Sequence, residues 1–189
     1  MKIMQFIMII LVIIFGWFII FLYAENSDTQ EIKKMDNKFK EMHVATFAGG
    51  CFWCVESDFA KIDGVIRTVS GYTEGHKENP SYEEVSSGDT GHVEAVQVWY
   101  DPSRLTYEEL LDVFWRHVNP TDSGGQFADR GSQYRPVIFF HNNEQKRLAE
   151  ISRKSLDMSG RFDRPVITEI LEFKSFYEAE EYHQDYYKN

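Results

Sequence analysis

The only two cysteines of this 189-residue chain stand three positions apart, where a strand pattern changes into a helix pattern. Residues 43–48 are rich in β-forming side chains, and Gly49-Gly50 follows them as a turn. From Cys51 onwards, apolar side chains recur at three- and four-residue spacing, which predicts a helix. The sequence thus places a thiol at a helix N-terminus, where free N–H groups and the helix dipole stabilise an anion. We therefore expect the pKa of Cys51 to be lowered.

Cysteine usage limits the chemistry further. Two cysteines in one Cys-x-x-Cys motif are too few for a structural disulfide framework, so they indicate redox chemistry or half of a metal site. A zinc site needs two more ligands, and the six histidines show no His-x₃₋₅-His spacing, so we expect no metal centre. A pair of buried cysteines that act only as small hydrophobes is the remaining alternative.

The charge of the chain bears on its partners. Residues 43–189 hold 15 basic and 25 acidic residues, which accounts for the whole net charge of −10. An acidic body without a basic stripe argues against a nucleic acid partner. With 43% hydrophobic residues, the chain is able to bury a sizeable core.

The N-terminal end contains an uninterrupted apolar run. Residues 6–24 are 19 positions without a charge, and as a helix they span roughly 28 Å, close to the thickness of a bilayer's hydrocarbon core. We interpret residues 1–24 as a signal anchor or a cleaved signal peptide, and residues 25–42 as a linker. Lys2 is the only basic residue before the run. The positive-inside tendency therefore directs residues 43–189 outside the cytoplasm, as a membrane-anchored or secreted domain.

Strand and helix patterns are mixed along the rest of the chain. The expected strands after the first helix are residues 64–71, 92–100, 134–141 and 166–173, and the expected helices are residues 106–118 and 142–158. Two long loops, residues 72–91 and 121–133, are the natural places for a binding site. Residues 175–187 are expected to form a short aromatic helix or turn. This order predicts an α+β or α/β domain with a mixed sheet.

At this point the motifs support a family resemblance. The stretches that carry it are Gly50-Cys51-Phe52-Trp53, Gly71-Tyr72-Thr73, and residues 79–85, 87–96, 119–121, 129–135, 176–180 and 182–184. Together they resemble the A-type peptide-methionine sulfoxide reductases, which act on the S epimer of the sulfoxide. The matches run in family order over residues 43–187. The resemblance implies the two-layer, mixed-sheet fold of that family and an oxidoreductase activity that repairs oxidised methionine.

The resemblance also implies roles for particular residues. A thiolate that attacks a sulfoxide sulfur leaves negative charge on the oxygen, so the reaction requires an acid, hydrogen-bond donors and an apolar wall for the S-methyl group. Cys51 matches the nucleophile, and Glu94 matches the acid. The strand around Glu94 is apolar, so we expect burial to raise the pKa of its carboxyl. The predicted substrate-binding residues are Phe52 and Trp53 at the methyl group, Tyr82 and Tyr134 at the oxygen, and Asp129 in the same pocket.

Regeneration of the nucleophile requires a second thiol. Attack on the sulfoxide leaves a sulfenic acid at Cys51, and condensation with another thiol converts it into a disulfide. Many family members carry this second cysteine in a C-terminal tail, but no cysteine follows Cys54 here. We therefore expect a Cys51–Cys54 disulfide that a thioredoxin-like protein, or dithiothreitol in vitro, reduces. The expected substrates are oxidised proteins, with no bound cofactor and a monomeric enzyme.

Two other functions compete with this interpretation. A thioredoxin-like disulfide oxidoreductase also uses Cys-x-x-Cys, but Trp53 here follows the nucleophile, and such a function leaves the stretches around Glu94 and Tyr134 unexplained. A surface-tethered binding module is the non-enzymatic alternative. Two assays distinguish the three functions: a sulfoxide reductase turns over a methionine sulfoxide substrate, a disulfide oxidoreductase reduces insulin disulfides, and a binding module does neither.

Overall fold

The structure is a computed structural model that describes residues 42–188. Its elements in chain order are β1 (His43–Ala48), α2 (Phe52–Ala60), β2 (Val65–Thr73), α3 (Tyr82–Ser86), β3 (Val93–Tyr100), α4 (Tyr107–His117), β4 (Gly125–Gln126), β5 (Asp129–Arg130), η1 (Ser132–Tyr134), β6 (Val137–Phe140), α5 (Asn143–Met158), β7 (Glu169–Glu172), β8 (Phe176–Glu178), η2 (Glu181–His183) and η3 (Tyr186–Lys188). Every strand and long helix predicted from the sequence is present, with ends that differ by a few residues.

Six of the strands form one mixed sheet, in the order β7-β6-β1-β3-β2-β8. Neighbouring strands are antiparallel except β6 and β7, which are parallel because α5 crosses between them. Strands β4 and β5 form a separate two-stranded hairpin. Strands β1 and β3 lie at the centre of the sheet. Two of the predicted site residues, Cys51 after β1 and Glu94 on β3, therefore start from adjacent strands.

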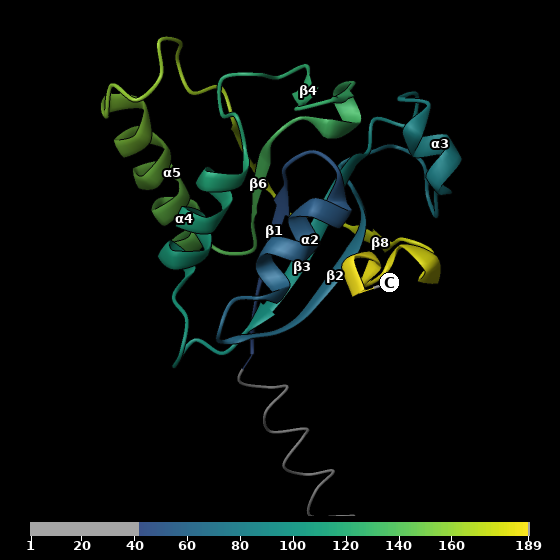
Figure 1. The fold of residues 1–189 in the computed structure, drawn as a ribbon, viewed down its shortest axis with the longest axis horizontal. Coiled ribbons are helices and arrows are strands. Elements are labelled where there is room, and N and C mark those ends of the chain that lie inside the picture. The colour runs from purple at the N-terminus through teal and green to yellow at the C-terminus, as the bar shows by residue number, and fades with distance from the viewer. Residues whose placement is uncertain (1–41, 189) are drawn as a thin grey trace, which may run out of the picture. The chain divides into compact units, whose positions relative to one another are not determined.

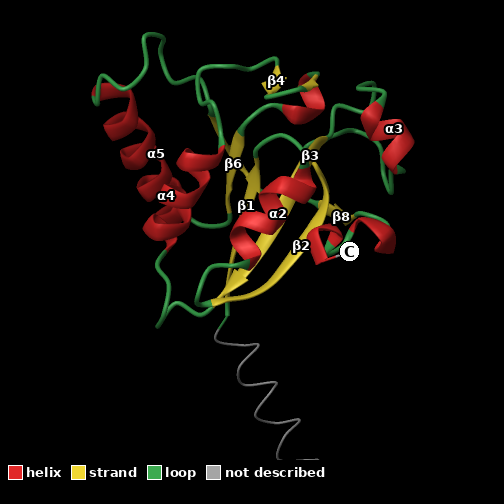
Figure 2. Ribbon diagram, viewed as in Figure 1, coloured by secondary structure: helices red, strands yellow, loops and turns green. Residues whose placement is uncertain are grey.

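The three long helices cover one face of the sheet (Figure 2). Phe47 of β1 stacks on Phe59 of α2, with ring centroids 4.9 Å apart, and on Phe114 of α4 at 5.3 Å. Because side chains alternate along a strand, Val96 and Val98 of β3 face this same helical layer. Glu94 shares their parity and therefore also points toward the helices. The mixed sheet with helices on one face confirms the predicted fold class.

Short elements in the loops were not predicted. The expected loop 72–91 contains α3, which begins with a capping box: the Ser81 hydroxyl accepts a hydrogen bond from Glu84 N–H, and the Glu84 carboxylate accepts one from Ser81 N–H. The expected helix or turn at 175–187 is partly wrong, because its first residues form the edge strand β8 against β2. Segments of three to five residues are too short for periodicity to reveal.

Among the described residues, no helix is long and apolar enough to cross a membrane. The predicted signal anchor or signal peptide, residues 1–24, and all but the last residue of the predicted linker 25–42 lie outside the described residues.

Candidate active site

The turn between β1 and α2 fixes Cys51 at the helix N-terminus, as the sequence predicts (Figure 1). Gly50 has φ +95°, and a Cβ there would lie 2.7 Å from Cβ of Gln126, so this turn requires glycine. The carbonyl of Cys51 accepts the N–H groups of Cys54 and Val55, at 3.1 and 3.2 Å, which starts the helix. Cys51 is half-buried and Cys54 is exposed, and both are free thiols.

The Glu94 side chain lies against this turn and the start of α2. It is only 2% exposed, and its Oε2 accepts a hydrogen bond of 3.0 Å from the backbone N–H of Phe52. Burial raises the pKa of Glu94 to about 7, although the Phe52 bond opposes this, and the charge of Asp129 adds to the increase. The expectation of a raised pKa is confirmed. A carboxyl that holds its proton near neutrality therefore lies beside the first residue after Cys51.

The expected low pKa of Cys51 is wrong for this resting structure. Burial raises the pKa of the Cys51 thiol to about 12, and the negative charge of Glu94 adds to the effect. The backbone N–H groups of Cys54 and Trp53 do lower it, as the helix N-terminus predicts, but they are outweighed. The sequence pattern located the stabilising dipoles, but the burial of the thiol depends on tertiary packing and was not predicted.

Two tyrosines complete the polar part of the site. Tyr82 is the first residue of α3, and Tyr134 ends η1. Burial raises the pKa of both phenols, to about 12 for Tyr134, and the charges of Glu94, Cys51 and Asp129 contribute to both shifts. Both phenols are therefore protonated hydrogen-bond donors at neutral pH. The Tyr82 ring also lies 6.3 Å from the ring of Phe52, the residue after Cys51.

The two predicted methyl-pocket residues differ in exposure. Phe52 is 1% exposed, and its ring lies 5.8 Å from Tyr72 and 5.2 Å from His183. Trp53 is half-buried, donates its indole N–H to Nδ1 of His183 at 3.1 Å, and stacks on Tyr186 at 4.0 Å. Trp53 therefore offers more surface to a bound group than Phe52, which is mainly a core residue.

The C-terminal segment contributes residues to which sequence reasoning assigned no role. His183 is 2% exposed. Its Nδ1 accepts a hydrogen bond from the indole N–H of Trp53, so the proton of the neutral imidazole ring lies on Nε2. That Nε2 has no hydrogen-bond partner among the described residues, and the Glu180 carboxylate lies 3.9 Å away. Glu180 also accepts the backbone N–H of Tyr82 and the hydroxyl of Tyr72, both at 3.0 Å. The motifs at 176–180 and 182–184 were the signals in the sequence for this arrangement.

Further bonds hold this segment against α2 and β2. The side-chain amide of Gln184 bonds to the backbone N–H and carbonyl of Ser70, at 2.9 Å each. The buried carboxylate of Glu56 accepts the N–H of Asp185 at 3.0 Å, and burial, with the charge of Asp185, raises the pKa of Glu56. The His183 ring is thereby fixed at the Cys51 end of α2.

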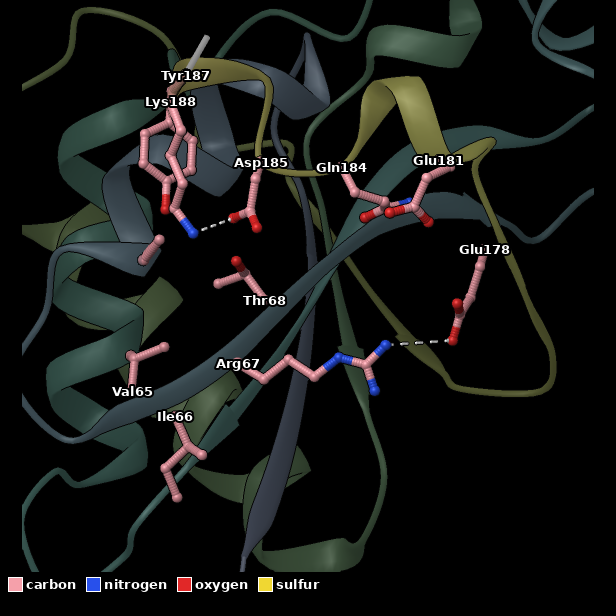
Figure 3. Close-up of a pocket in the computed structure, with 11 residues that line it drawn as sticks. Val65, Ile66, Arg67, Thr68, Glu178, Glu181, Gln184, Asp185, Tyr187 and Lys188 are labelled. Carbon is pink, nitrogen blue, oxygen red and sulfur yellow. Dashed lines mark ion pairs between the residues drawn. The ribbon is translucent and has the colours of Figure 1, made fainter.

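A polar cavity of about 340 Å³ lies between this segment and β2 (Figure 3). Ion pairs of Arg67 with Glu178 and of Lys188 with Asp185 border it. Its lining contains neither cysteine and none of the predicted site residues, so it is separate from the thiol site. Within residues 42–188, no group of three or more His, Cys, Asp or Glu side chains is arranged to hold a metal ion.

Comparison with known proteins identifies the family. A sequence model of the family "Peptide methionine sulfoxide reductase" matches residues 43–189. This chain belongs to the peptide methionine sulfoxide reductase family. It is accordingly an oxidoreductase, and the resemblance of its motifs is confirmed.

Individual relatives agree with this assignment. The peptide methionine sulfoxide reductase MsrA of Listeria monocytogenes serotype 4a is 56% identical over 149 residues, which cover 79% of this chain and 84% of that protein. MsrA of Bacillus licheniformis is 56% identical, with 79% and 82% covered. Among solved structures, reduced Mxr1 of Saccharomyces cerevisiae is 36% identical with a TM-score of 0.72, over 79% of this chain and 86% of that one. Mxr1 in complex with Trx2 is 28% identical with a TM-score of 0.54, over 78% and 86%.

Proposed function

We propose that this enzyme reduces the S epimer of methionine sulfoxide in oxidised proteins by attack of Cys51 on the sulfoxide sulfur. The observation that carries the proposal is the pairing of a half-buried thiol with Glu94, whose carboxyl is buried and whose pKa is raised to about 7. A protonated carboxyl is the group needed to donate a proton to the oxygen as the S–O bond breaks. Epimer selectivity rests on the family assignment alone.

The two titrating groups act as a pair. A charged Glu94 raises the pKa of Cys51, so the arrangement with the proton on Glu94 and the charge on Cys51 is electrostatically favoured over two charges. In the reaction, the Cys51 sulfur forms a bond to the sulfoxide sulfur, and the oxygen takes the Glu94 proton. The oxygen then passes as a hydroxyl to the Cys51 sulfur: the S–O bond of the substrate breaks, the sulfur–sulfur bond breaks, and the methionine thioether leaves with the electron pair of the sulfur–sulfur bond. Cys51 is left as a sulfenic acid, and the proton lost by the Cys51 thiol restores Glu94. Cys51 is oxidised by two electrons and the substrate is reduced by two.

The surrounding side chains fit the substrate in the same proposal. The Tyr82 and Tyr134 hydroxyls donate hydrogen bonds to the sulfoxide oxygen, for which their protonated state is required. Trp53 contacts the S-methyl group, with Phe52 behind it. Asp129 lines the exposed edge of the pocket, and its charge adds to the effect of burial, which raises the pKa of Glu94.

Cys54 is proposed to resolve the sulfenic acid. Its thiol attacks the Cys51 sulfur, the S–O bond breaks, water leaves, and a Cys51–Cys54 disulfide forms. Cys54 lies one helical turn from Cys51, and its N–H already bonds to the Cys51 carbonyl. The test is mass spectrometry after one turnover without reductant: wild type loses two hydrogens, whereas Cys54→Ser carries one added oxygen or an intermolecular adduct. Wild type that instead keeps the added oxygen at Cys51 and a free Cys54 thiol after one turnover would contradict the assignment.

The proposed electron donor is a thioredoxin-like dithiol protein, with dithiothreitol as a substitute in vitro. The solved complex of the related Mxr1 with Trx2 supports this choice. We further propose a monomer that needs no bound cofactor. Residues 42–188 are proposed to lie outside the cytoplasm, tethered or secreted through residues 1–24, and protease digestion of intact cells tests this: protection of the domain inside intact cells contradicts it.

The activity itself is tested with an epimer-resolved assay in dithiothreitol. We expect wild type to reduce the S epimer only, Cys51→Ser to show no turnover, and Cys54→Ala to complete a first turnover and then slow. Absence of turnover in wild type, or equal rates on both epimers, would contradict the proposal. Reduction of insulin disulfides in place of the sulfoxide would favour a thioredoxin-like function.

A further inference from the structure

A groove borders the candidate active site on the side away from the C-terminal segment. It has a volume of about 420 Å³ and is lined by the C-terminal end of α4, the β4–β5 hairpin and the chain after α5. The side chains used below are His117, Phe127, Arg161, Phe162 and Arg164, and we call it the Phe127 groove. The hairpin and the segment after α5 lie at the same end of the domain (Figure 1).

The groove begins next to both cysteines. A Cβ on Gly49 would lie 3.3 Å from the His117 ring, so the wall of the groove packs against the turn that carries Cys51. His117 also bonds to the carboxylate of Asp58 at 2.6 Å. Asp58 is four residues after Cys54 on α2, and residues at this spacing are neighbours on one helix face, about 5–6 Å apart at Cβ. The exposed Cys54 thiol therefore lies on the face of α2 that adjoins the groove.

The groove presents apolar surface that no described residue covers. Phe127 is 81% exposed at the tip of the hairpin, and its φ of +50° is a conformation that costs a non-glycine residue about 1 kcal/mol. The ring makes only a distant edge contact with His117, at 6.4 Å between centroids. Phe162 on the opposite wall lies under the Arg161 guanidinium, 5.6 Å from it. Two aromatic rings at an open groove are typical of a protein-binding surface.

Charge distinguishes the groove from the rest of the domain. Its lining holds three arginines and one acidic residue, Asp163, in a chain of net charge −10. Arg116 is paired with Asp112. Among the described residues, no carboxylate lies within ion-pair distance of Arg161 or Arg164, and the charge of Arg164 acts on Asp122. A positive groove in an acidic protein attracts a carboxylate-bearing partner to this one place and repels it elsewhere.

We propose that the Phe127 groove is the docking surface for the dithiol protein that reduces the Cys51–Cys54 disulfide, and that this donor binds through an apolar, carboxylate-bearing rim around its attacking cysteine. The proposal rests on the proposed function. From the groove, a donor thiolate reaches the exposed sulfur of Cys54. It forms a mixed disulfide there, the Cys51–Cys54 bond breaks, and Cys51 leaves with the electron pair and takes a proton from solvent.

The second donor thiol then completes the transfer. It attacks the donor sulfur of the mixed disulfide and releases Cys54, so that the donor becomes a disulfide and both enzyme cysteines return to the reduced state. On the other side of α2, the C-terminal segment packs against the helix, where Tyr186 stacks on Trp53. The approach from the groove is consistent with the exposure of Cys54 and the partial burial of Cys51.

The experiment compares two reductants on the full chain at saturating methionine sulfoxide. One is dithiothreitol, and the other is an acidic thioredoxin kept reduced by its reductase. For Phe127→Ala and for Arg164→Glu, we expect kcat/KM for thioredoxin to fall about fivefold, with a weaker salt dependence for Arg164→Glu. Turnover with dithiothreitol should stay within about twofold of wild type, which also reports that the variants fold.

Matched controls lie on α5. Lys154→Glu reverses an exposed charge, and Ile151→Ala removes an exposed apolar side chain. Ser152 of α5 bonds to Trp115 of α4, so the Ser152 side of α5 faces α4. Lys154 lies two residues after Ser152, a rotation of about 200° around the helix axis, and therefore points away from α4 and from the groove. Both controls should keep wild-type values with either reductant.

Three outcomes overturn the proposal or its basis. An unchanged kcat/KM for thioredoxin in both groove variants contradicts the docking site. A raised KM for a sulfoxide-containing peptide in dithiothreitol, with the thioredoxin KM unchanged, assigns the groove to the polypeptide substrate instead. Absence of wild-type turnover with dithiothreitol contradicts the proposed function itself. The wild-type assay alone reveals this, without the groove variants.

Discussion

At the scale of single residues, the environment of the site disfavours the charged forms of both Cys51 and Glu94. Glu94 and Cys51 each have a raised pKa because both are buried, and the charge of one opposes ionisation of the other. The resting enzyme therefore contains a neutral thiol and a carboxyl that titrates near neutrality. In the proposed mechanism, the reactive thiolate forms when Glu94 carries the proton that the sulfoxide oxygen will need.

Alkylation tests the state of the thiols. We expect iodoacetamide at pH 8 to modify Cys54 well before Cys51, because Cys54 is exposed and burial keeps the pKa of Cys51 at about 12. Peptide mapping by mass spectrometry measures both rates. The Glu94→Gln variant removes one cause of the raised pKa and should increase the Cys51 rate. Faster modification of Cys51 than of Cys54 in wild type would show that the thiol is already activated at rest.

Glu94→Gln should also reduce the rate of a single turnover by about 10²–10⁴-fold, because it removes the proton donor. The wild-type rate should fall as pH rises through about 7, where Glu94 loses its proton, and this decline should be absent in the variant. Rapid-mixing measurements of methionine formation between pH 5.5 and 9 provide the test. A retained rate in the variant would assign the acid to another group.

The same residue makes a prediction about stability. The folded pKa of Glu94 lies above its ordinary value of 4.5, so its contribution is fully present below about pH 4.5 and is lost as pH rises through about 7. The shift to about 7 corresponds to about 3 kcal/mol. Relative to wild type, Glu94→Gln should therefore gain up to that amount between pH 4.5 and 8, measured by urea unfolding. A constant difference between the two proteins would contradict the burial of this carboxyl.

At the scale of elements, short segments place the polar ligands. Helix α3 has only five residues, which is too short to be stable alone, and its first residue is Tyr82. The Ser81–Glu84 capping box and the bond from Tyr82 N–H to Glu180 hold it in position. The position of Tyr82, which we propose binds the substrate, thus depends on a cap and on a contact with the C-terminal segment, 98 residues away.

Two equivalent caps give a matched pair of variants. Ser81 caps α3 and Thr106 caps α4, each with a complete capping box. Replacement of either by alanine should cost about 1 kcal/mol of stability. Only Ser81→Ala should also raise KM for the sulfoxide substrate, because α4 carries no proposed substrate-binding residue. Thermal unfolding and steady-state kinetics measure the two effects, and equal KM values would show that Tyr82 does not need the cap.

At the scale of the whole molecule, the described residues form one contact unit that begins at Met42. The site draws on the β1–α2 turn, β3, α3, the β4–β5 hairpin, η1 and the C-terminal segment, all within that unit. The family match likewise begins at residue 43. We therefore expect residues 42–189 to fold and to carry out the reaction without the preceding residues.

A chain that starts at Met42 tests this directly. We expect it to unfold cooperatively and to reduce methionine sulfoxide with dithiothreitol within about twofold of the full chain, because every proposed catalytic contact is retained. Urea titration and the epimer-resolved assay provide the measurements, with Cys51→Ser in the same fragment as the inactive control. Loss of cooperative unfolding would show that the N-terminal residues take part in the fold.

The sequence by itself determined the elements with a clear period and supplied the candidates for the reacting groups. It placed Cys51 at a helix N-terminus and Glu94 on a strand with apolar neighbours, since both depend on local pattern. Only the tertiary structure decided the electrostatic state of the thiol, because burial of Cys51 comes from segments distant in sequence. The same holds for His183 beside Trp53 and for the Phe127 groove, which exist because loops far apart in the chain meet around α2. Periodicity describes each element, but it carries no information about which loops become neighbours.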